Sequence, residues 1–319
     1  MLRARALLDN IRRYWVLVFA AACLPLAILS LDDLYLQASG RLQFDAAWLL
    51  MAAITQFSVW LALALGWRET VTCCAHFRIG VRDAFAHLGL FTAGKYLPGK
   101  VWGALARGTR LGQAGSTLGG AAQATLVEQV LVFHSAAALC ALIGAWVLDD
   151  AWRLPLAAVA LILLLAGLPI GRIGVSTARA VLVLLRPQME TAAIPAISAP
   201  AYMRLFAIYF LAWFLHGLVL VCVAAAFLGH EPEARLVASM VFANAAAMLV
   251  GFVAVFAPAG IGVRDATLAS LLAVSMPLAD AALLAIVARM FSVAADLVAG
   301  TLAVLPASPG RSTDQSPDR

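Results

Sequence analysis

Residues 205–229 read LFAIYFLAWFLHGLVLVCVAAAFLG and contain no Lys, Arg, Asp or Glu. About 20 predominantly apolar residues in a helix are enough to cross the ~30 Å hydrocarbon core of a bilayer. This stretch therefore predicts a membrane-spanning helix, and it sets the interpretation of the other apolar stretches in the chain.

The composition of the whole chain agrees with this interpretation. Of its 319 residues, 64% are hydrophobic and only 12% are charged, against roughly 25% charged in an average soluble domain. The mean hydropathy is +0.94. Apolar side chains at this density would aggregate in water but are solvated by lipid. We therefore expect an integral membrane protein.

Stretches similar to 205–229 recur along the chain. They lie at residues 15–31, 46–67, 118–148, 154–171 and 236–257. A further one, 281–305, contains Arg289 and Asp296, and it follows a short apolar piece at 266–279. The sequence predicts an all-α transmembrane bundle with about seven or eight spans. We expect one domain, residues 1–305, followed by a disordered Pro- and Ser-rich tail at 306–319.

Basic residues alternate from side to side of the predicted spans. Arginines gather in the N-terminal tail and in the connections at 68–110 and 172–204, whereas the intervening loops are richer in Asp and Glu. Cytoplasmic loops carry an excess of Lys and Arg. This pattern predicts a cytoplasmic N-terminus in a bacterial inner membrane, and it explains the net charge of +5 without nucleic acid as a partner. Trp67 is among the aromatic residues expected at span ends.

One segment between predicted spans has features of a broken membrane helix. Residues 94–102 read GKYLPGKVW, in which the only two lysines of the chain, Lys95 and Lys100, flank Pro98 and Gly99. The backbone N–H groups and the helix N-terminus freed at such a break can bind an anion, and nearby cations reinforce the attraction. The alternative is a cytoplasmic loop whose cations fix the orientation and contact anionic lipid. We expect re-entrant or broken helices near 81–112.

A second break of the same kind follows the predicted span at 236–257. It contains Pro258, Gly260 and Gly262, followed by Arg264 and Asp265. Two Pro- and Gly-interrupted segments in comparable places of two halves indicate a transporter-like site built from discontinuous helices. The alternative is an ordinary turn between helices. We expect a re-entrant or broken helix near 258–279.

Several polar side chains fall inside predicted spans, where a charge costs at least ~2.5–3.5 kcal/mol to insert. Arg289 and Asp296 lie seven residues, or two helical turns, apart on one face. Glu128 is a candidate partner for Arg289 or for a coupling proton, and Asp265 and Asp296 are further candidates for coupling or ion pairing. Structural ion pairs between helices are the alternative. His134 and His216 are expected to be packing residues, and Asn244 an interhelical hydrogen-bonding residue.

Motifs of soluble catalysis are missing from the sequence. It has no P-loop, no HExxH, no clustered Cys or His ligands and no GxSxG. No stretch outside the predicted spans is long enough for a catalytic domain. We therefore expect no catalytic residues, no metal, no cofactor and no enzymatic activity.

The motifs at the two breaks resemble the flippase-like family of the lysylphosphatidylglycerol synthase transmembrane region. The resemblance covers nearly the whole chain and rests on GKYLPGKVW with Arg107, on residues 126–129 (LVEQ), on PAGIGVRDA at 258–266 and on Ala288-Arg289. It implies an all-helical membrane domain that translocates or presents a phospholipid or a polyprenyl-linked lipid, with aminoacyl transfer left to a separate soluble domain.

The residues of this chain that match family motif positions are Pro98, Gly99, Arg107, Glu128, Pro258, Gly260, Gly262, Arg264 and Arg289. The chain departs from the family pattern at Asp265, where the family has Glu, and at Gln129, where a basic residue is common. A shorter carboxylate and a lost charge bear on the ion-pair network more than on the fold.

The sequence thus favours a flippase-like protein that binds an anionic lipid headgroup. The candidate substrate-binding cations are Lys95, Lys100, Arg107, Arg264 and Arg289. Membrane lipids are the expected partners. Two other functions remain open: a secondary transporter of a small polar solute, and a non-transporting membrane subunit for a lipid-modifying enzyme or a glycosyltransferase.

Overall fold

The computed structural model describes residues 43–96, 101–165, 167, 169, 176, 197–229, 233–254, 257–304 and 311–312. The α-helices in these ranges are α2 (Ala46–Ala75), α3 (Val81–Gly94), α4 (Trp102–Gln113), α5 (Leu118–Val147), α6 (Asp150–Leu165), α8 (Ala199–Leu228), α9 (Ala234–Val253), α10 (Val263–Leu272) and α11 (Leu278–Thr301). Two 3₁₀ turns, η1 (Pro258–Gly260) and η2 (Leu302–Val304), complete the helical elements. The predicted all-α class is confirmed.

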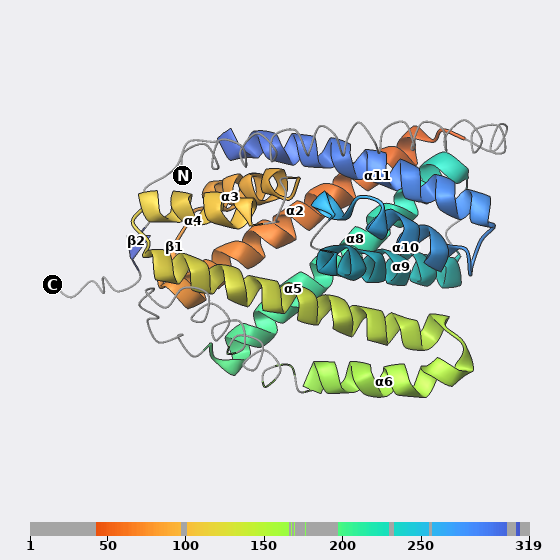
Figure 1. The fold of residues 1–319 in the computed structure, drawn as a ribbon, viewed down its shortest axis with the longest axis horizontal. Coiled ribbons are helices and arrows are strands. Elements are labelled where there is room, and N and C mark those ends of the chain that lie inside the picture. The colour runs from red at the N-terminus through yellow and green to blue at the C-terminus, as the bar shows by residue number, and fades with distance from the viewer. Residues whose placement is uncertain are drawn as a thin grey trace, which may run out of the picture.

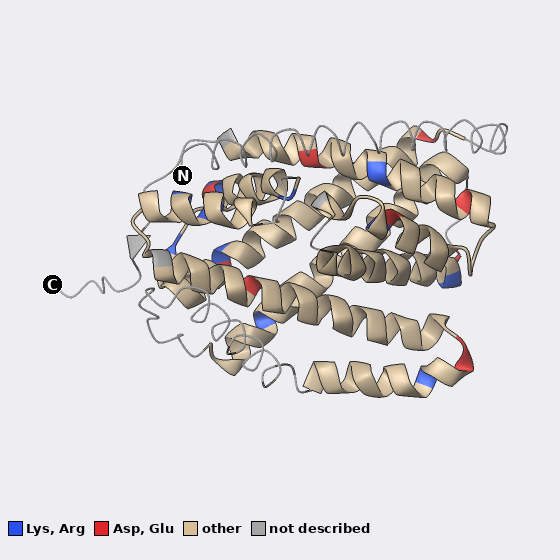
Figure 2. Ribbon diagram, viewed as in Figure 1, with Lys and Arg blue, Asp and Glu red and all other residues tan. Residues whose placement is uncertain are grey.

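Five of the described helices, α2, α5, α8, α9 and α11, are long and apolar enough to cross a membrane. Figure 2 shows how few charged residues lie along them. The predicted span at 15–31 lies outside the described residues. The span predicted at 154–171 is described mainly through α6, which has 16 residues. The described helices therefore support a multi-pass bundle, with seven or eight spans as an approximate total.

The centre of the bundle is the antiparallel pair formed by α2 and α8, which run obliquely across the molecule in Figure 1. The backbone N–H groups of Gln43 and Asp45, at the start of α2, donate to the carbonyls of Phe227 and Ala226 at the end of α8. Around this pair, α11 lies along one edge and α5 with α6 along the other (Figure 1). The termini of α2 and α8 thus fix the direction of one helix against the other.

Local sequence accounts for the ends of these helices. Asp45 caps α2, because its carboxylate accepts hydrogen bonds from the N–H groups of Ala47 and Trp48 at 2.8 and 3.3 Å. Helix α8 ends at Gly229, whose φ of 59° lies in the left-handed region that glycine adopts without strain. The central pair is therefore delimited by an acidic N-cap and a glycine C-cap.

The first predicted break forms a helical hairpin. Helices α3 and α4 have 14 and 12 residues, fewer than the ~20 needed to cross a bilayer. They pack against each other, and α3 also packs against α2 and α11. A Cβ atom on Gly103 would lie 2.6 Å from the carbonyl oxygen of Phe91, so only glycine permits this close approach. The predicted re-entrant or broken structure near 81–112 is confirmed.

The second predicted break is also confirmed. Helix α9 ends at Val253, and the chain passes through η1 into α10, which has 10 residues. Positive φ values at Ala259, Gly260 and Gly262 (49°, 68° and 81°) turn the backbone here. Helix α10 packs on α9 and α11. The apolar piece at 266–279 therefore contains a short helix and a turn instead of a span.

A small strand pair joins two distant segments. Strand β1 (Phe77–Arg78) follows α2 and pairs antiparallel with β2 (Arg311–Ser312). The predicted disordered tail, 306–319, therefore has two residues in a strand. The rest of that tail lies outside the described residues.

Small residues allow the central helices to approach closely. Gly217 of α8 is buried against α9, and a Cβ atom at this position would lie 2.8 Å from Cα, Cγ1 and Cγ2 of Val241. Real Cβ contacts do not occur at that distance to a neighbouring backbone. Membrane helices pack through such small residues because lipid provides no hydrophobic force between them.

We expect Gly217→Ala to lower the thermal stability of the protein in detergent, because the added methyl group must push α8 and α9 apart. Overpacking of this kind costs about 1–3 kcal/mol. Gly300→Ala is the matched control, since a Cβ atom there has no atom within 4 Å. The melting temperature checks both variants, and a Gly217→Ala protein that melts with the wild type contradicts the tight α8–α9 contact.

Candidate functional site

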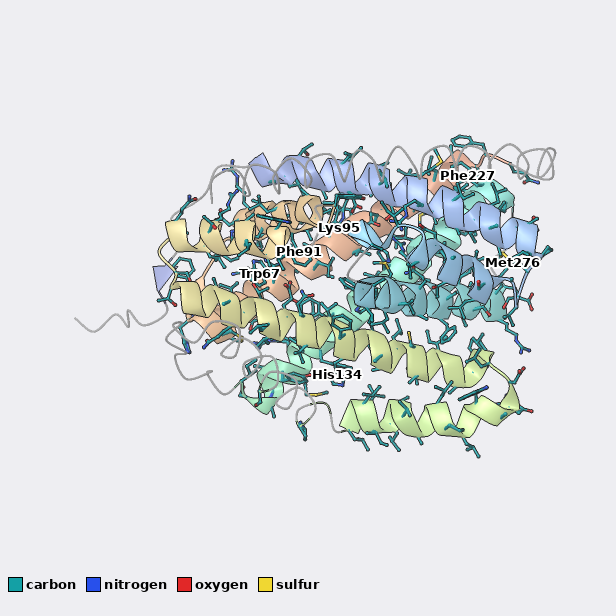
Figure 3. All side chains as sticks on the ribbon, in the orientation of Figure 1. Trp67, Phe91, Lys95, His134, Phe227 and Met276 are labelled. Atoms are coloured by element: carbon teal, nitrogen blue, oxygen red, sulfur yellow. The ribbon has the colours of Figure 1, made fainter. Side chains whose placement is uncertain are left out.

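A cavity of about 180 Å³ lies where the first helix break meets the central helix pair. Its wall combines aromatic rings, among them Trp60, Trp67 and Phe91, with charged and amide groups. Figure 3 shows Trp67, Phe91 and Lys95 close together in this part of the molecule. The polar side chains lining it are Gln56, Thr92, Lys95, Arg107, Glu128, Gln129, His216 and Asp296. An apolar wall with a few convergent polar groups is typical of a binding site.

A buried ion pair forms one end of this cavity. Arg107 of α4 pairs with Glu128 of α5, and the two side chains are only 3% and 8% exposed. The Cζ atom of Arg107 lies 3.4 Å from the ring centroid of Trp67 and 4.6 Å from that of Phe91. Two aromatic faces thus sandwich the planar guanidinium, which a lysine ammonium could not replace.

Further hydrogen bonds hold this pair in place. The Tyr209 hydroxyl donates to Oε1 of Glu128 at 3.3 Å. The indole N–H of Trp67 donates to Nδ1 of His87 at 2.9 Å, which fixes the plane of the ring that stacks on Arg107. Buried charges need partners of this kind because each unpaired ion is expensive away from water. The cluster ties together α2, α3, α4, α5 and α8.

A second ion pair lies at the first helix break. Nζ of Lys95 is 2.7 Å from Oδ2 of Asp296 in α11, with 35% and 13% of the two side chains exposed. The Tyr96 hydroxyl also donates to Asp296. This carboxylate therefore receives two donors from consecutive residues that follow α3, and it fixes the start of the break against α11.

A third ion pair lies at the second helix break. Arg289 of α11 binds Asp265 of α10: its Nε donates to Oδ1 at 3.0 Å and to Oδ2 at 3.2 Å, and its Nη2 donates to Oδ2 at 2.9 Å. Asp265 also accepts from the N–H of Gly262 at 3.1 Å and so caps α10. The shorter carboxylate at position 265 reaches both groups. Nη1 of Arg289 donates to the carbonyl of Ala259 at 3.3 Å.

The two helix breaks contact each other directly. The N–H of Ala259 donates to the carbonyl of Lys95 at 3.0 Å, although the two residues lie in different halves of the chain. Backbone groups at membrane depth must be satisfied within the protein. Each break therefore supplies a hydrogen-bonding partner that the other needs.

The structure changes one expected pairing. Glu128 binds Arg107, and Arg289 binds Asp265, so the candidate pair of Glu128 with Arg289 does not form. The sequence does not indicate which cation packs next to Glu128, because Arg107 lies 21 residues away and meets it only through the packing of α4 on α5.

The two histidines and Asn244 have defined partners. His134 contacts the Tyr202 hydroxyl at 2.7 Å and the Leu163 carbonyl at 2.8 Å, as a satisfied packing residue does. Asn244 of α9 bonds to His216 of α8 at 2.9 Å, which is the expected interhelical hydrogen bond. His216 also lines the cavity.

Three of the predicted site residues, Pro98, Gly99 and Lys100, lie outside the described residues. Pro258, Gly260 and Gly262 lie at the second break, within or beside η1. Arg264 is buried in the first turn of α10 and is 6% exposed.

Sequence reasoning missed several residues of the cavity wall. Trp67 was expected at the end of a span, but α2 continues to Ala75 and Trp67 is 2% exposed. Gln56 had a signal, since it is an amide inside an otherwise apolar span. Phe91, which lines the cavity, and Tyr209, which donates to Glu128 behind it, had none.

We expect Glu128→Gln to destabilise the protein by about 3–5 kcal/mol, because it leaves the Arg107 guanidinium buried without a counter-charge. Adding Arg107→Met should recover a large part of that loss, since the lone charge is then gone. Melting temperatures of the two single variants and the double variant test this coupling.

The exposed pair Arg153–Asp150 provides the matched control, and Asp150→Asn should leave the melting temperature unchanged. Strictly additive effects of Glu128→Gln and Arg107→Met would show that the two charges are not coupled.

Comparisons with known proteins identify a family for this chain. Residues 5–300 match the family described as "Lysylphosphatidylglycerol synthase TM region". No curated protein and no solved structure matches the chain. The family match covers both helix breaks, the Arg107–Glu128 pair and the Arg289–Asp265 pair. The chain therefore belongs to the lysylphosphatidylglycerol synthase transmembrane-region family.

Proposed function

We propose that this protein binds the anionic headgroup of a phospholipid or a polyprenyl-linked lipid and translocates that lipid across the bacterial inner membrane, with its N-terminus in the cytoplasm. The observation that carries the proposal is the cavity beside the first helix break, in which charged groups and aromatic rings converge among membrane-spanning helices. Membership of the family supports a membrane role for the chain.

The size of the cavity favours a headgroup as the part of the lipid that is bound. Its volume of about 180 Å³ is below the roughly 300–1,000 Å³ of a pocket for a drug-sized molecule. A phosphate with a small polar substituent is compatible with this volume, whereas acyl or polyprenyl chains are not. The chains would stay in the surrounding lipid.

The charged residues of the cavity favour reversible binding of a lipid headgroup. Lys95 and Arg107 are each paired with a carboxylate. A headgroup that enters therefore meets cations whose charge is already balanced, and it competes with Asp296 or Glu128 for them. Binding of this kind is reversible, as translocation requires. We propose no enzymatic activity for these residues.

Reconstitution into liposomes tests the proposal. Phosphatidylglycerol that carries a fluorophore on an acyl chain, and so has its natural headgroup, is quenched from outside with dithionite. We expect a second, slow loss of fluorescence in liposomes with the protein, as lipid from the inner leaflet becomes accessible. An aminoacylated phosphatidylglycerol and a polyprenyl phosphate are the further substrates. Rates equal to those of protein-free liposomes for all three lipids contradict the function.

We expect Lys95→Gln to lower the rate of lipid movement about tenfold, which corresponds to ~1.4 kcal/mol, because the headgroup loses a cation and Asp296 is left unpaired in the cavity wall. Arg153→Gln is the matched control, since Arg153 is exposed on α6 and its ion-pair partner among the described residues is Asp150. Equal rates for Lys95→Gln and the wild type exclude Lys95 from the translocation path.

A further inference from the structure

Among the cations that the structure describes near the helix breaks, one forms no ion pair with a carboxylate. Lys95, Arg107 and Arg289 pair with Asp296, Glu128 and Asp265. Arg264 makes no ion pair within the described part of the chain, and its Nε atom is buried without a hydrogen-bond partner there. The side chain is only 6% exposed. Asp265 and Asp296 attract this arginine without forming an ion pair with it. Since removing an ion from water is costly unless it is paired, a direct counter-charge would stabilise it.

Packing, not solvation, holds Arg264 in this position. Cβ atoms on Gly251 and Gly260 would lie 3.0 and 3.4 Å from Cβ of Arg264. The two glycines, on α9 and in η1, therefore leave the space through which the arginine side chain enters the interior. Arg264 is also the second residue of α10, so it lies at the positive end of that helix dipole.

Arg264 lines a second cavity, of about 20 Å³, which has room for one water-sized atom. Its other polar side chains are Gln56 of α2, His216 of α8, Asn244 of α9 and Ser292 of α11. None of the described residues that line this cavity is a carboxylate. Its polar side chains therefore offer several hydrogen-bond donors and no negative charge.

Several of these donors have no partner among the residues that the structure describes. The amide nitrogen of Asn244 can only donate, so Nδ1 of His216 accepts its hydrogen bond and Nε2 carries the proton of the neutral ring. Neither this Nε2–H, nor the buried Gln56 amide, nor the Ser292 hydroxyl bonds to another described side chain. Among the described polar atoms around this cavity, Nε of Arg264 is the one that is fully buried without a partner, and buried polar groups are nearly always paired. The convergence of the other groups beside it therefore indicates a missing acceptor.

We propose that this cavity binds one oxygen of a phosphate group, with Arg264 as its counter-charge. The inference rests on the proposed function in one respect, which is that the phosphate belongs to the translocated headgroup. Gln56 and His216 line both cavities. A phosphate can therefore place one oxygen beside Arg264 while the group esterified to it occupies the larger cavity.

This arrangement separates the roles of the cations. The three paired ones hold the helix breaks and the α3–α4 hairpin in place. Among these four cations, Arg264 is the one whose charge is not balanced by an ion pair with a described carboxylate. A monoester or diester of phosphate fits the donor set, because its oxygens accept hydrogen bonds from guanidinium, imidazole, amide and hydroxyl groups alike.

Thermal shift of the purified, delipidated full-length protein in uncharged detergent tests the site. Inorganic phosphate, glycerol 1-phosphate and phosphatidylglycerol are titrated separately, with chloride as the control anion. We expect phosphate compounds, and not chloride, to raise the melting temperature, because a ligand that binds the folded state stabilises it.

We expect Arg264→Gln to abolish this increase in melting temperature. Without ligand, the variant should melt no lower than the wild type, because the substitution removes an unpaired buried charge. Arg153→Gln should keep the shift.

Ser292→Ala, which retains Arg264, is the second variant that tests the phosphate site if Arg264→Gln does not fold. We expect it to weaken phosphate binding about tenfold, as the loss of one hydrogen bond to a charged group does. A shift with inorganic phosphate but not with glycerol 1-phosphate supports the site and assigns free phosphate as its ligand. Equal shifts in wild type and Arg264→Gln, equal shifts with chloride, or unchanged binding in Ser292→Ala overturn it.

The phosphate-binding experiment and the lipid-movement assay test the anion site and the translocation function separately. A phosphate shift that requires Arg264, in a protein that moves no lipid, keeps the anion site and removes the translocation function. Lipid movement that is unchanged in Arg264→Gln, without any phosphate shift, removes the site and keeps the function.

Discussion

Two turns of α11 separate Arg289 from Asp296, and the arrangement of both helix breaks depends on these two charges. Their spacing along the helix axis is ~10 Å. Arg289 binds the second break through Asp265 and the Ala259 carbonyl. Asp296 binds the first through Lys95 and Tyr96. A single helix face thus positions two segments that are more than 150 residues apart in the chain.

The breaks would be unfavourable in a bilayer without these contacts. Irregular backbone is tolerated at membrane depth only where it is buried in protein or lines a polar cavity. Here Ala259 and Lys95 satisfy one another, and the charges of α11 satisfy the groups beside them. The same interruption that frees these backbone groups also makes room for the two cavities. The irregular structure and the candidate site are therefore one feature of the fold.

Much of the fold follows from the sequence, since uncharged stretches such as 205–229 and Pro- and Gly-containing stretches such as 257–262 report directly on helices and their breaks. The pairing of charges does not. Glu128 could have joined any nearby cation, and only the packing of α4 on α5, with α4 held close to α3 at Gly94 and Gly103, brings Arg107 to it. The isolation of Arg264 is equally invisible in the sequence, because a missing partner is a property of the folded neighbourhood. Gln56 and His216 were visible as polar residues in apolar spans, but their shared position between two cavities was not.

The hydrogen bond between Ala259 and Lys95 has a mechanical consequence. Lys95 and Ala259 each bind a charged residue of α11, and they also bind each other. The two helix breaks and α11 are therefore connected in a closed set of contacts. A displacement of α11 would therefore act on Lys95 and Ala259 together. Helix α11, which belongs to the C-terminal half of the chain, thus couples the positions of the helix breaks in both halves.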